Sequence, residues 1–169
     1  AASFHGSLLF DPDSVRTLKG EPFRVFTAFW KACLALPAPL GPLPPPRELR
    51  APTVLPPSLD LRELDLVPRT DWTAGIRKAW RPGEKGALDS LSVFLSGSVS
   101  AYASDRDRPD VAGTSRLSPH LHFGEISPRR VWHETMKMVG KSGPTDTARS
   151  AEAFLRQLGW REFAHHLLH

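Results

Sequence analysis

GTSRLSPHLHFGEISPR, residues 113–129, decides how the second half of the chain is organised. It contains two Ser-Pro pairs, Ser118-Pro119 and Ser127-Pro128. Serine is a favoured N-cap residue and proline suits the first helical position, so each pair predicts a helix start. We therefore expect short helices over 118–125 and 127–139.

Helical patterns continue on both sides of this stretch. Residues 84–102 carry apolar side chains every three or four positions, and so does the segment from Asp146 to the end. That spacing places the apolar side chains on one face of a helix. We expect a charged loop over 103–113 and a turn over 140–144, so the second half is predicted to be all-helical.

The first half has a different character, because 13 of the 17 prolines lie at or before Pro82. One short amphipathic helix is expected over 27–36. The stretch from there to Pro82 should be extended or polyproline-like, since proline lacks an N–H and excludes helix or central strand. It is either a disordered linker or an ordered segment that wraps a neighbouring surface. We favour the second, because Leu, Val and Trp72 recur within it.

Composition limits the function classes without choosing among them. The net charge of +4 and the pI near 9.6 permit a polyanionic partner, but basic and acidic residues are interspersed. A single cysteine, Cys33, excludes an internal disulfide, and neither a signal-peptide pattern nor a long apolar run occurs. A soluble, cytoplasmic protein with no membrane partner is expected. The sequence does not predict the oligomeric state. With no initiator Met and a helical pattern at His169, the chain reads as an internal fragment.

One polar cluster could hold an anion. Tyr102 and Arg106 precede a run that is rich in hydroxyls and ends at a helix start, namely Thr114, Ser115, Arg116, Leu117 and Ser118. Hydroxyls and free N–H groups just before a helix form a cradle for phosphate. The alternative is that Ser115 and Ser118 are simple caps and Arg116 is a surface charge.

A second cluster lies on the last predicted helix. Gln157, Trp160 and Arg161 stand at i, i+3 and i+4, which predicts one shared face. An aromatic ring, an amide and a fixed cation suit an unstacked nucleic-acid base. The alternative is a core tryptophan with Arg161 at its edge.

The histidines do not predict a metal site. His120 and His122 flank Leu121, and His165, His166 and His169 close the chain, but the cysteine or acidic partners of a typical zinc site are missing. No phosphate-binding P-loop, dinucleotide fingerprint or serine nucleophile motif occurs. We expect no metal and no certain catalytic residue in this chain.

The order of these pieces resembles the DNA photolyase/cryptochrome family, specifically its class I-like deoxyribodipyrimidine photolyases. The resemblance rests on four stretches that occur in the family's order: KGEPFRVFTAFWKACL (19–34), WRPGEKGALDSLSVFL (80–95), AYASDRDRPDVAGTSRLSPHLHFGEISPR (101–129) and FLRQLGWREFAHHLL (154–168). It implies an interdomain connecting segment over 1–82, followed by the N-terminal part of a helical FAD-binding domain over 83–169. The family's antenna domain and the rest of its FAD domain would lie outside this chain.

The resemblance also implies roles for individual residues. Tyr102, Gln157 and the run 114–118 would contact FAD, with the run around its phosphates. Arg106 and Arg161 would lie at the DNA, and Trp160 would stack on the damaged pyrimidines. Gln157 would also contact the lesion. Gln157 departs from the glutamate that is common in cyclobutane-dimer photolyases, and it resembles several cryptochromes and (6-4) photolyases.

The implied function is light-driven repair of ultraviolet-damaged DNA. Photolyases are among the enzymes that take the target base out of the stack, and reduced FAD then supplies the electron that splits the dimer. The antenna chromophore would bind the absent N-terminal domain. A cryptochrome photoreceptor or a (6-4) photolyase is the alternative. Taken alone, the chain is expected to bind FAD weakly or not at all and to be inactive.

Overall fold

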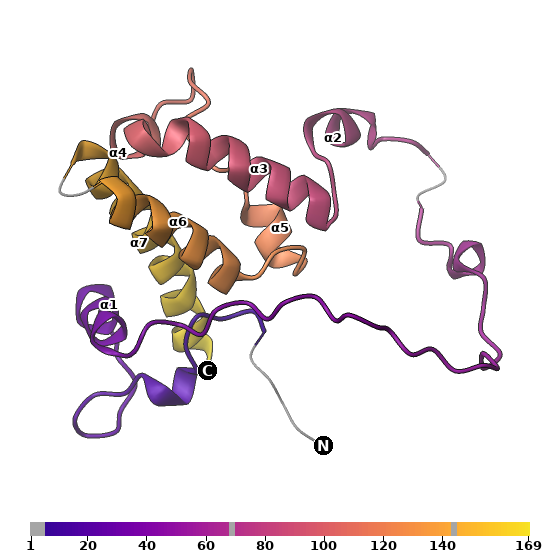
Figure 1. Ribbon diagram of the computed structural model, residues 1–169, viewed down its shortest axis with the longest axis horizontal. Helices are drawn as coiled ribbons and strands as arrows, with labels where there is room; N and C mark the ends of the chain where they lie inside the picture. Colours follow the sequence, from indigo (N-terminus) through magenta and orange to yellow (C-terminus); the bar gives the residue numbers. More distant parts are fainter. Residues whose placement is uncertain (1–5, 68–69, 143–144) are drawn as a thin grey trace. The chain divides into compact units, whose positions relative to one another are not determined.

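The computed structural model of the chain describes residues 6–67, 70–142 and 145–169. Within those residues the chain forms helices and loops and no strand, which confirms the mainly α fold class (Figure 1). Contacts divide the chain into two compact units, one of 1–42 with 82–169 and one of 43–81. Described residues up to 42 thus group with the later helices, whereas the functional boundary near residue 82 stays a prediction.

The larger unit is organised around its last helix. Its elements in chain order are η1 (Pro12–Ser14), α1 (Phe26–Ala35), α3 (Glu84–Ser96), η3 (Ser98–Ala101), α4 (Tyr102–Asp105), α5 (Ser118–His122), α6 (Pro128–Ser142) and α7 (Asp146–Leu168). Helix α7 contacts α1, α4, α6 and η3. This one long helix therefore joins the N-terminal segment to the middle of the chain.

The predicted apolar face of α7 is buried in the core. Ala151, Phe154, Leu155, Leu158 and Phe163 are all at most 6% exposed. They pack with α1, α3 and α6 residues in a single cluster that also includes Phe26, Phe29, Trp30, Cys33, Leu91, Phe94, Val131 and Trp132. Burying a large apolar side chain stabilises a fold by about 1.5–3 kcal/mol, so this cluster is what holds the unit together.

The helix predicted over 84–102 is broken, which corrects the sequence-based expectation. It divides at Gly97 into α3, η3 and α4. Gly97 has φ −136° and ψ −82°, outside the helical region, and its N–H bonds to the Phe94 carbonyl. Periodicity failed here because apolar spacing persists across a glycine, which readily leaves the helical conformation.

The two Ser-Pro pairs begin helices as predicted, but only one serine is the cap. The Ser127 hydroxyl accepts the Arg130 N–H at 3.1 Å, whereas Ser118 lies inside α5 with Leu117 in the cap position. Helix α5 ends at His122 rather than 125. Helix α6 continues through Ser142, so the turn expected from 140 starts later; residues 143–144 lie outside the described part.

The smaller unit contains two short helices, η2 (Leu61–Leu64) and α2 (Ala74–Ala79), where we expected none. Both lie in stretches without proline, so nothing there blocks a helical turn. Its apolar side chains are exposed, Leu43, Val54 and Trp72 among them. None of its described residues is buried, and its wrapping role stays a prediction.

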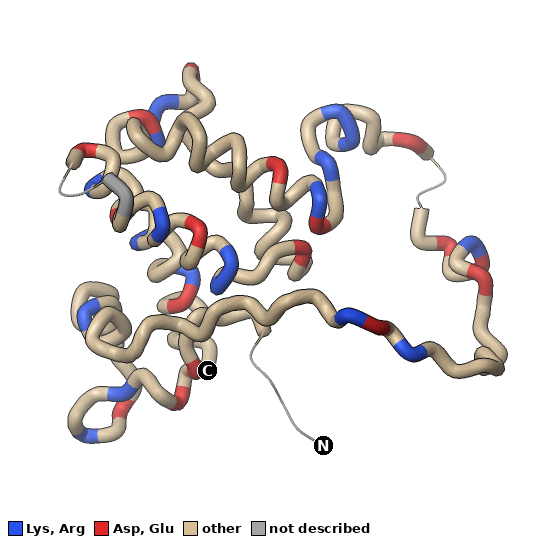
Figure 2. The backbone as a smooth tube through the Cα atoms, in the orientation of Figure 1, with Lys and Arg blue, Asp and Glu red and all other residues tan. Residues whose placement is uncertain are grey.

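Two further features concern charge and hydropathy. Basic and acidic residues are interspersed along the described chain (Figure 2). In the described part, no helix is both long enough and apolar enough to cross a membrane.

Candidate functional site

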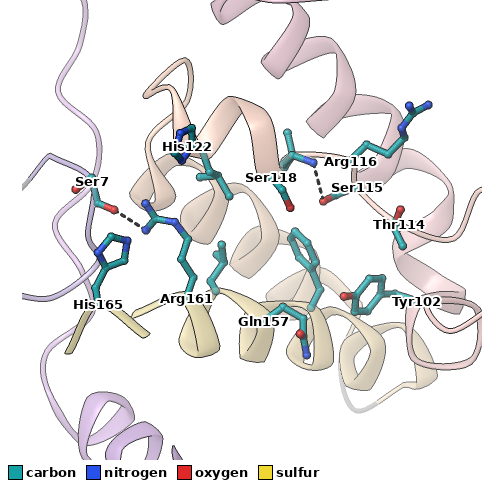
Figure 3. Close-up of a pocket in the computed structure, with 14 residues that line it drawn as sticks. Ser7, Tyr102, Thr114, Ser115, Arg116, Ser118, His122, Gln157, Arg161 and His165 are labelled. Carbon is teal, nitrogen blue, oxygen red and sulfur yellow. Dashed lines mark hydrogen bonds between the residues drawn. The ribbon is translucent and has the colours of Figure 1, made fainter. Parts of the chain in front are cut away.

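A cavity of about 790 Å³ brings together residues from both ends of the larger unit (Figure 3). It combines hydroxyls, aromatic rings, an amide and cations, and its lining comprises Ser7, Tyr102, Thr114, Ser115, Arg116, Leu117, Ser118, Leu121, His122, Phe154, Gln157, Leu158, Arg161 and His165. Its volume lies in the range of sites for small molecules and cofactors. Eight residues are predicted from the sequence to bind an anion or FAD. Seven of them line this cavity, namely Tyr102, the run 114–118 and Gln157, whereas Arg106 does not.

The loop 113–118 is shaped by two backbone features. A Cβ on Gly113 would lie 2.7 Å from Cβ of Asp105, so only glycine permits this close approach to α4. Arg116 has φ +55°, in the left-handed region that a non-glycine residue adopts at a cost. The Ser115 hydroxyl accepts the Leu117 N–H at 3.4 Å. The loop is thereby bent so that Thr114, Ser115 and Ser118 border the cavity.

Tyr102 forms an aromatic wall of the cavity. It is 6% exposed and meets the Phe94 and Phe154 rings edge-on, at centroid distances of 5.6 and 5.3 Å. Burial raises the pKa of its phenol, which therefore stays a neutral hydrogen-bond donor. Arg106 lies outside the cavity lining; its guanidinium is over the Tyr102 ring at 5.7 Å and its Nε is 3.4 Å from Asp107.

The predicted shared face of α7 is divided in the structure. Gln157 and Arg161 line the cavity, whereas Trp160 does not. Each helical residue turns by about 100°, so Trp160 and Arg161 fall on opposite flanks of Gln157. The Arg161 Nη1 donates to the Ser7 carbonyl at 2.6 Å.

Trp160 is neither a core residue nor fully free. Its side chain is 46% exposed, and one face of the indole stacks on the Phe26 ring at 3.7 Å and 9°. Phe26 in turn stacks on Trp30 and has Arg156 over its ring at 5.2 Å. Because 46% of its surface is exposed, Trp160 is not a buried core residue, whereas its stacking role stays a prediction.

The histidines have separate roles. His120 Nδ1 lies 2.5 Å from the Glu125 carboxylate, which lowers the pKa of Glu125 and ties α5 to the following turn. His166 Nε2 accepts the Phe23 N–H at 2.9 Å. His165 borders the cavity, and burial, followed by the charge on Arg161, lowers its pKa. No group of three or more metal-type ligands occurs among the residues that the structure describes.

Comparisons with known proteins agree on one family. A family model described as DNA photolyase matches residues 1–48. A deoxyribodipyrimidine photo-lyase of Agrobacterium fabrum is 42% identical over 98% of this chain and 34% of that protein, and cryptochrome-1 of Arabidopsis thaliana is 35% identical over 98% of this chain and 25% of that protein. A crystal structure of a bacterial class III photolyase from Agrobacterium tumefaciens superimposes with a TM-score of 0.86 at 42% identity, covering 96% of this chain and 33% of that one.

The chain belongs to the photolyase and cryptochrome family. It spans a quarter to a third of the length of these relatives. As a photolyase-family chain, it thus carries one part of what a full-length member contains.

Several cavity residues of this photolyase-family chain were not anticipated. His165 continues the i, i+4 series of Gln157 and Arg161, so the helical spacing was a signal that could have found it. His122 lies four residues after Ser118 on α5. Ser7 gave no signal at all, because its place depends on contacts with residues more than 150 positions away.

Proposed function

We propose that this chain supplies part of the FAD site, and part of the lesion-facing surface, of a light-driven DNA repair photolyase. The observation that carries the proposal is the cavity that joins loop 113–118 to Tyr102 and Gln157. Its family relatives include proteins named deoxyribodipyrimidine photo-lyase. Photolyase-family proteins generally bind FAD, and the residues present fit that group.

The fit rests on matched chemistry along the cavity. Hydroxyls of Thr114, Ser115 and Ser118 can donate to phosphate oxygens, and bonds to charged groups are the stronger ones. The bent backbone at Arg116 would let the loop hold these oxygens, while Leu117, Leu121 and Phe154 supply apolar surface. The Tyr102 phenol and Gln157 amide lie within the same lining and offer further polar contacts.

These residues would bind and orient rather than react. FAD, when bound, supplies the light-driven electron transfer that splits a pyrimidine dimer. Tyr102 and Phe154 exclude water from one side of the cavity, and the amide of Gln157 holds a polar group at the wall. The exposed face of Trp160 offers a stacking surface for a base taken out of the duplex.

Ultraviolet-damaged DNA is the proposed partner, with Trp160 as its principal contact. The Arg106 side chain, directly after α4, is 33% exposed and is proposed to lie near the DNA backbone. Arg161 is proposed to face DNA only through the part of its guanidinium that Ser7 leaves available.

The decisive experiment is a repair assay with the full-length protein. Oligonucleotides that carry either a cyclobutane dimer or a (6-4) lesion are irradiated with blue light, and intact bases are then measured. Repair of the cyclobutane dimer supports the proposal. Repair of the (6-4) lesion, or no repair despite bound FAD, would instead support the alternatives that Gln157 favours, a (6-4) photolyase or a cryptochrome photoreceptor.

A further inference from the structure

The N-terminal segment 7–10 is held on the helices by charged side chains rather than by regular secondary structure. Glu162 Oε2 accepts the Leu9 N–H at 2.8 Å and the Phe10 N–H at 3.4 Å. Backbone polar groups that are buried need partners, and here a side chain of α7 supplies them. Leu8 and Leu9 are 6% and 2% exposed, so the middle of the segment is buried in the fold.

Two cations complete this arrangement. Arg161 Nη1 donates to the Ser7 carbonyl at 2.6 Å, and Arg129 Nε donates to the Leu8 carbonyl at 3.3 Å. Glu162 Oε1 lies 3.5 Å from Arg161 Nη1. One carboxylate therefore contacts both the segment and the arginine that holds the segment's first residue.

Glu162 itself is outside the cavity, but its partners are not. Its side chain is 3% exposed and does not line the cavity, whereas Ser7 and Arg161 both do (Figure 3). A carboxylate this deeply buried is costly unless it is paired and hydrogen-bonded. The contacts that compensate the buried carboxylate, with the Leu9 and Phe10 amides and with Arg161, also hold the Ser7 end of the cavity wall in place.

We propose that Glu162 is a positioning residue, which holds segment 7–10 and the Arg161 guanidinium together and so sets the Ser7 end of the cavity wall. This rests on the proposed function only in that the ligand is taken to be FAD. Glu162 does not line the cavity, so it acts through Arg161 and Ser7, which do.

The main test is Glu162→Gln in the full-length protein. Glutamine keeps an oxygen for the Leu9 and Phe10 amides but turns an NH₂ donor toward Arg161. Above a pH of about 7, where the Glu162 carboxyl is ionised in the folded state, a charge-assisted bond becomes a neutral one, so we expect amide exchange at Leu9 and Phe10 to accelerate about tenfold. FAD affinity should also fall about tenfold. It is measured near 1 M salt, where the screening length is only about 3 Å, so that the lost charge of Glu162 does not itself change the attraction of FAD.

Two further variants test whether Glu162 acts on the cavity through Arg161. Glu152→Gln makes the same charge change at an exposed site on the same helix and should leave both exchange and FAD affinity unchanged. Arg161→Met removes the guanidinium that contacts both Glu162 and the Ser7 carbonyl. It should weaken FAD binding even if the Glu162→Gln variant does not fold. In the Arg161→Met background, Glu162→Gln should cost no further FAD affinity.

Three results would overturn the proposal: unchanged exchange at Leu9 and Phe10, faster exchange with unchanged FAD affinity, or a full additional loss of FAD affinity in the Arg161→Met background. Failure of the wild-type protein to bind FAD is a different outcome. It would contradict the proposed function, while the exchange measurement would still decide whether Glu162 holds the segment.

Discussion

The indole of Trp160 stacks face to face on the ring of Phe26, with 3.7 Å between centroids and 9° between planes. Phe26 is 4% exposed, so it is a rigid backing, while Trp160 is 46% exposed. This pairing fixes the orientation of the tryptophan before any ligand arrives, which lowers the entropy that binding would otherwise cost.

Trp160→Ala in the full-length protein should weaken binding of cyclobutane-dimer DNA by about 1–3 kcal/mol, because a stacking surface is lost. Fluorescence anisotropy with lesion-containing and undamaged oligonucleotides measures this. Trp160→Phe, which keeps an aromatic face, is the matched control and should lose much less. Equal affinity of the alanine variant and the wild type would exclude Trp160 as the lesion platform.

Thr114→Val should weaken FAD binding by about 1.5–3 kcal/mol, the typical value of a hydrogen bond to a charged group. The substitution keeps the side-chain shape and removes the hydroxyl that borders the cavity. Equilibrium titration of the full-length apoprotein with FAD gives the affinity. Thr53→Val, at an exposed position in the smaller unit, should have no effect. A wild-type affinity in Thr114→Val would remove this hydroxyl from the phosphate site.

Gly159→Ala should destabilise the fold by about 1–3 kcal/mol, as overpacking does. The new Cβ would lie 2.5 Å from Cε3 of Trp30, a ring fixed in the core at 9% exposure. Gly140→Ala is the matched control, since its Cβ would meet nothing within 4 Å on α6. It should stabilise the protein by up to about 1 kcal/mol through helix propensity. Urea unfolding of both variants checks the two opposite signs.

The free energy of unfolding should fall as the pH rises from about 4.5 to about 7, through Glu162. Burial raises the pKa of Glu162 from 4.5 to about 7, so in this window the folded state keeps a proton that the unfolded state has lost. The contribution of Glu162 to the free energy of unfolding is complete below about pH 4.5 and is lost above about pH 7. The total change is on the order of 3 kcal/mol. Unfolding of wild type and Glu162→Gln across this range isolates it by difference. A difference that does not vary with pH would show that the carboxyl titrates normally.

The isolated chain should bind FAD weakly or not at all and should not repair DNA. It spans about a third of its photolyase relatives, so the remaining walls of their flavin site would come from elsewhere in a full-length protein. Absorbance spectra after mixing purified chain with FAD and removing free cofactor provide the measurement. A stoichiometric, protein-bound flavin spectrum would contradict this prediction.

The sequence predicted well those features that depend on neighbours along the chain. The start of α7 at Asp146, its buried apolar face and the cap at Ser127 all follow from local spacing and capping chemistry. The polar run 114–118 was equally visible, because its three hydroxyl residues lie within five consecutive positions. The break at Gly97 was not, since a glycine within a periodic pattern can continue a helix or leave it.

Residue identity and helical period by themselves determined the helical fold, the family and the composition of the polar clusters. Only the tertiary structure decided which clusters meet: it brought Ser7 to Arg161, turned Trp160 away from Gln157 onto Phe26, and buried Glu162 against Leu9. The physical reason is that period and capping act over a few residues, whereas burial and long-range hydrogen bonds depend on how distant segments pack.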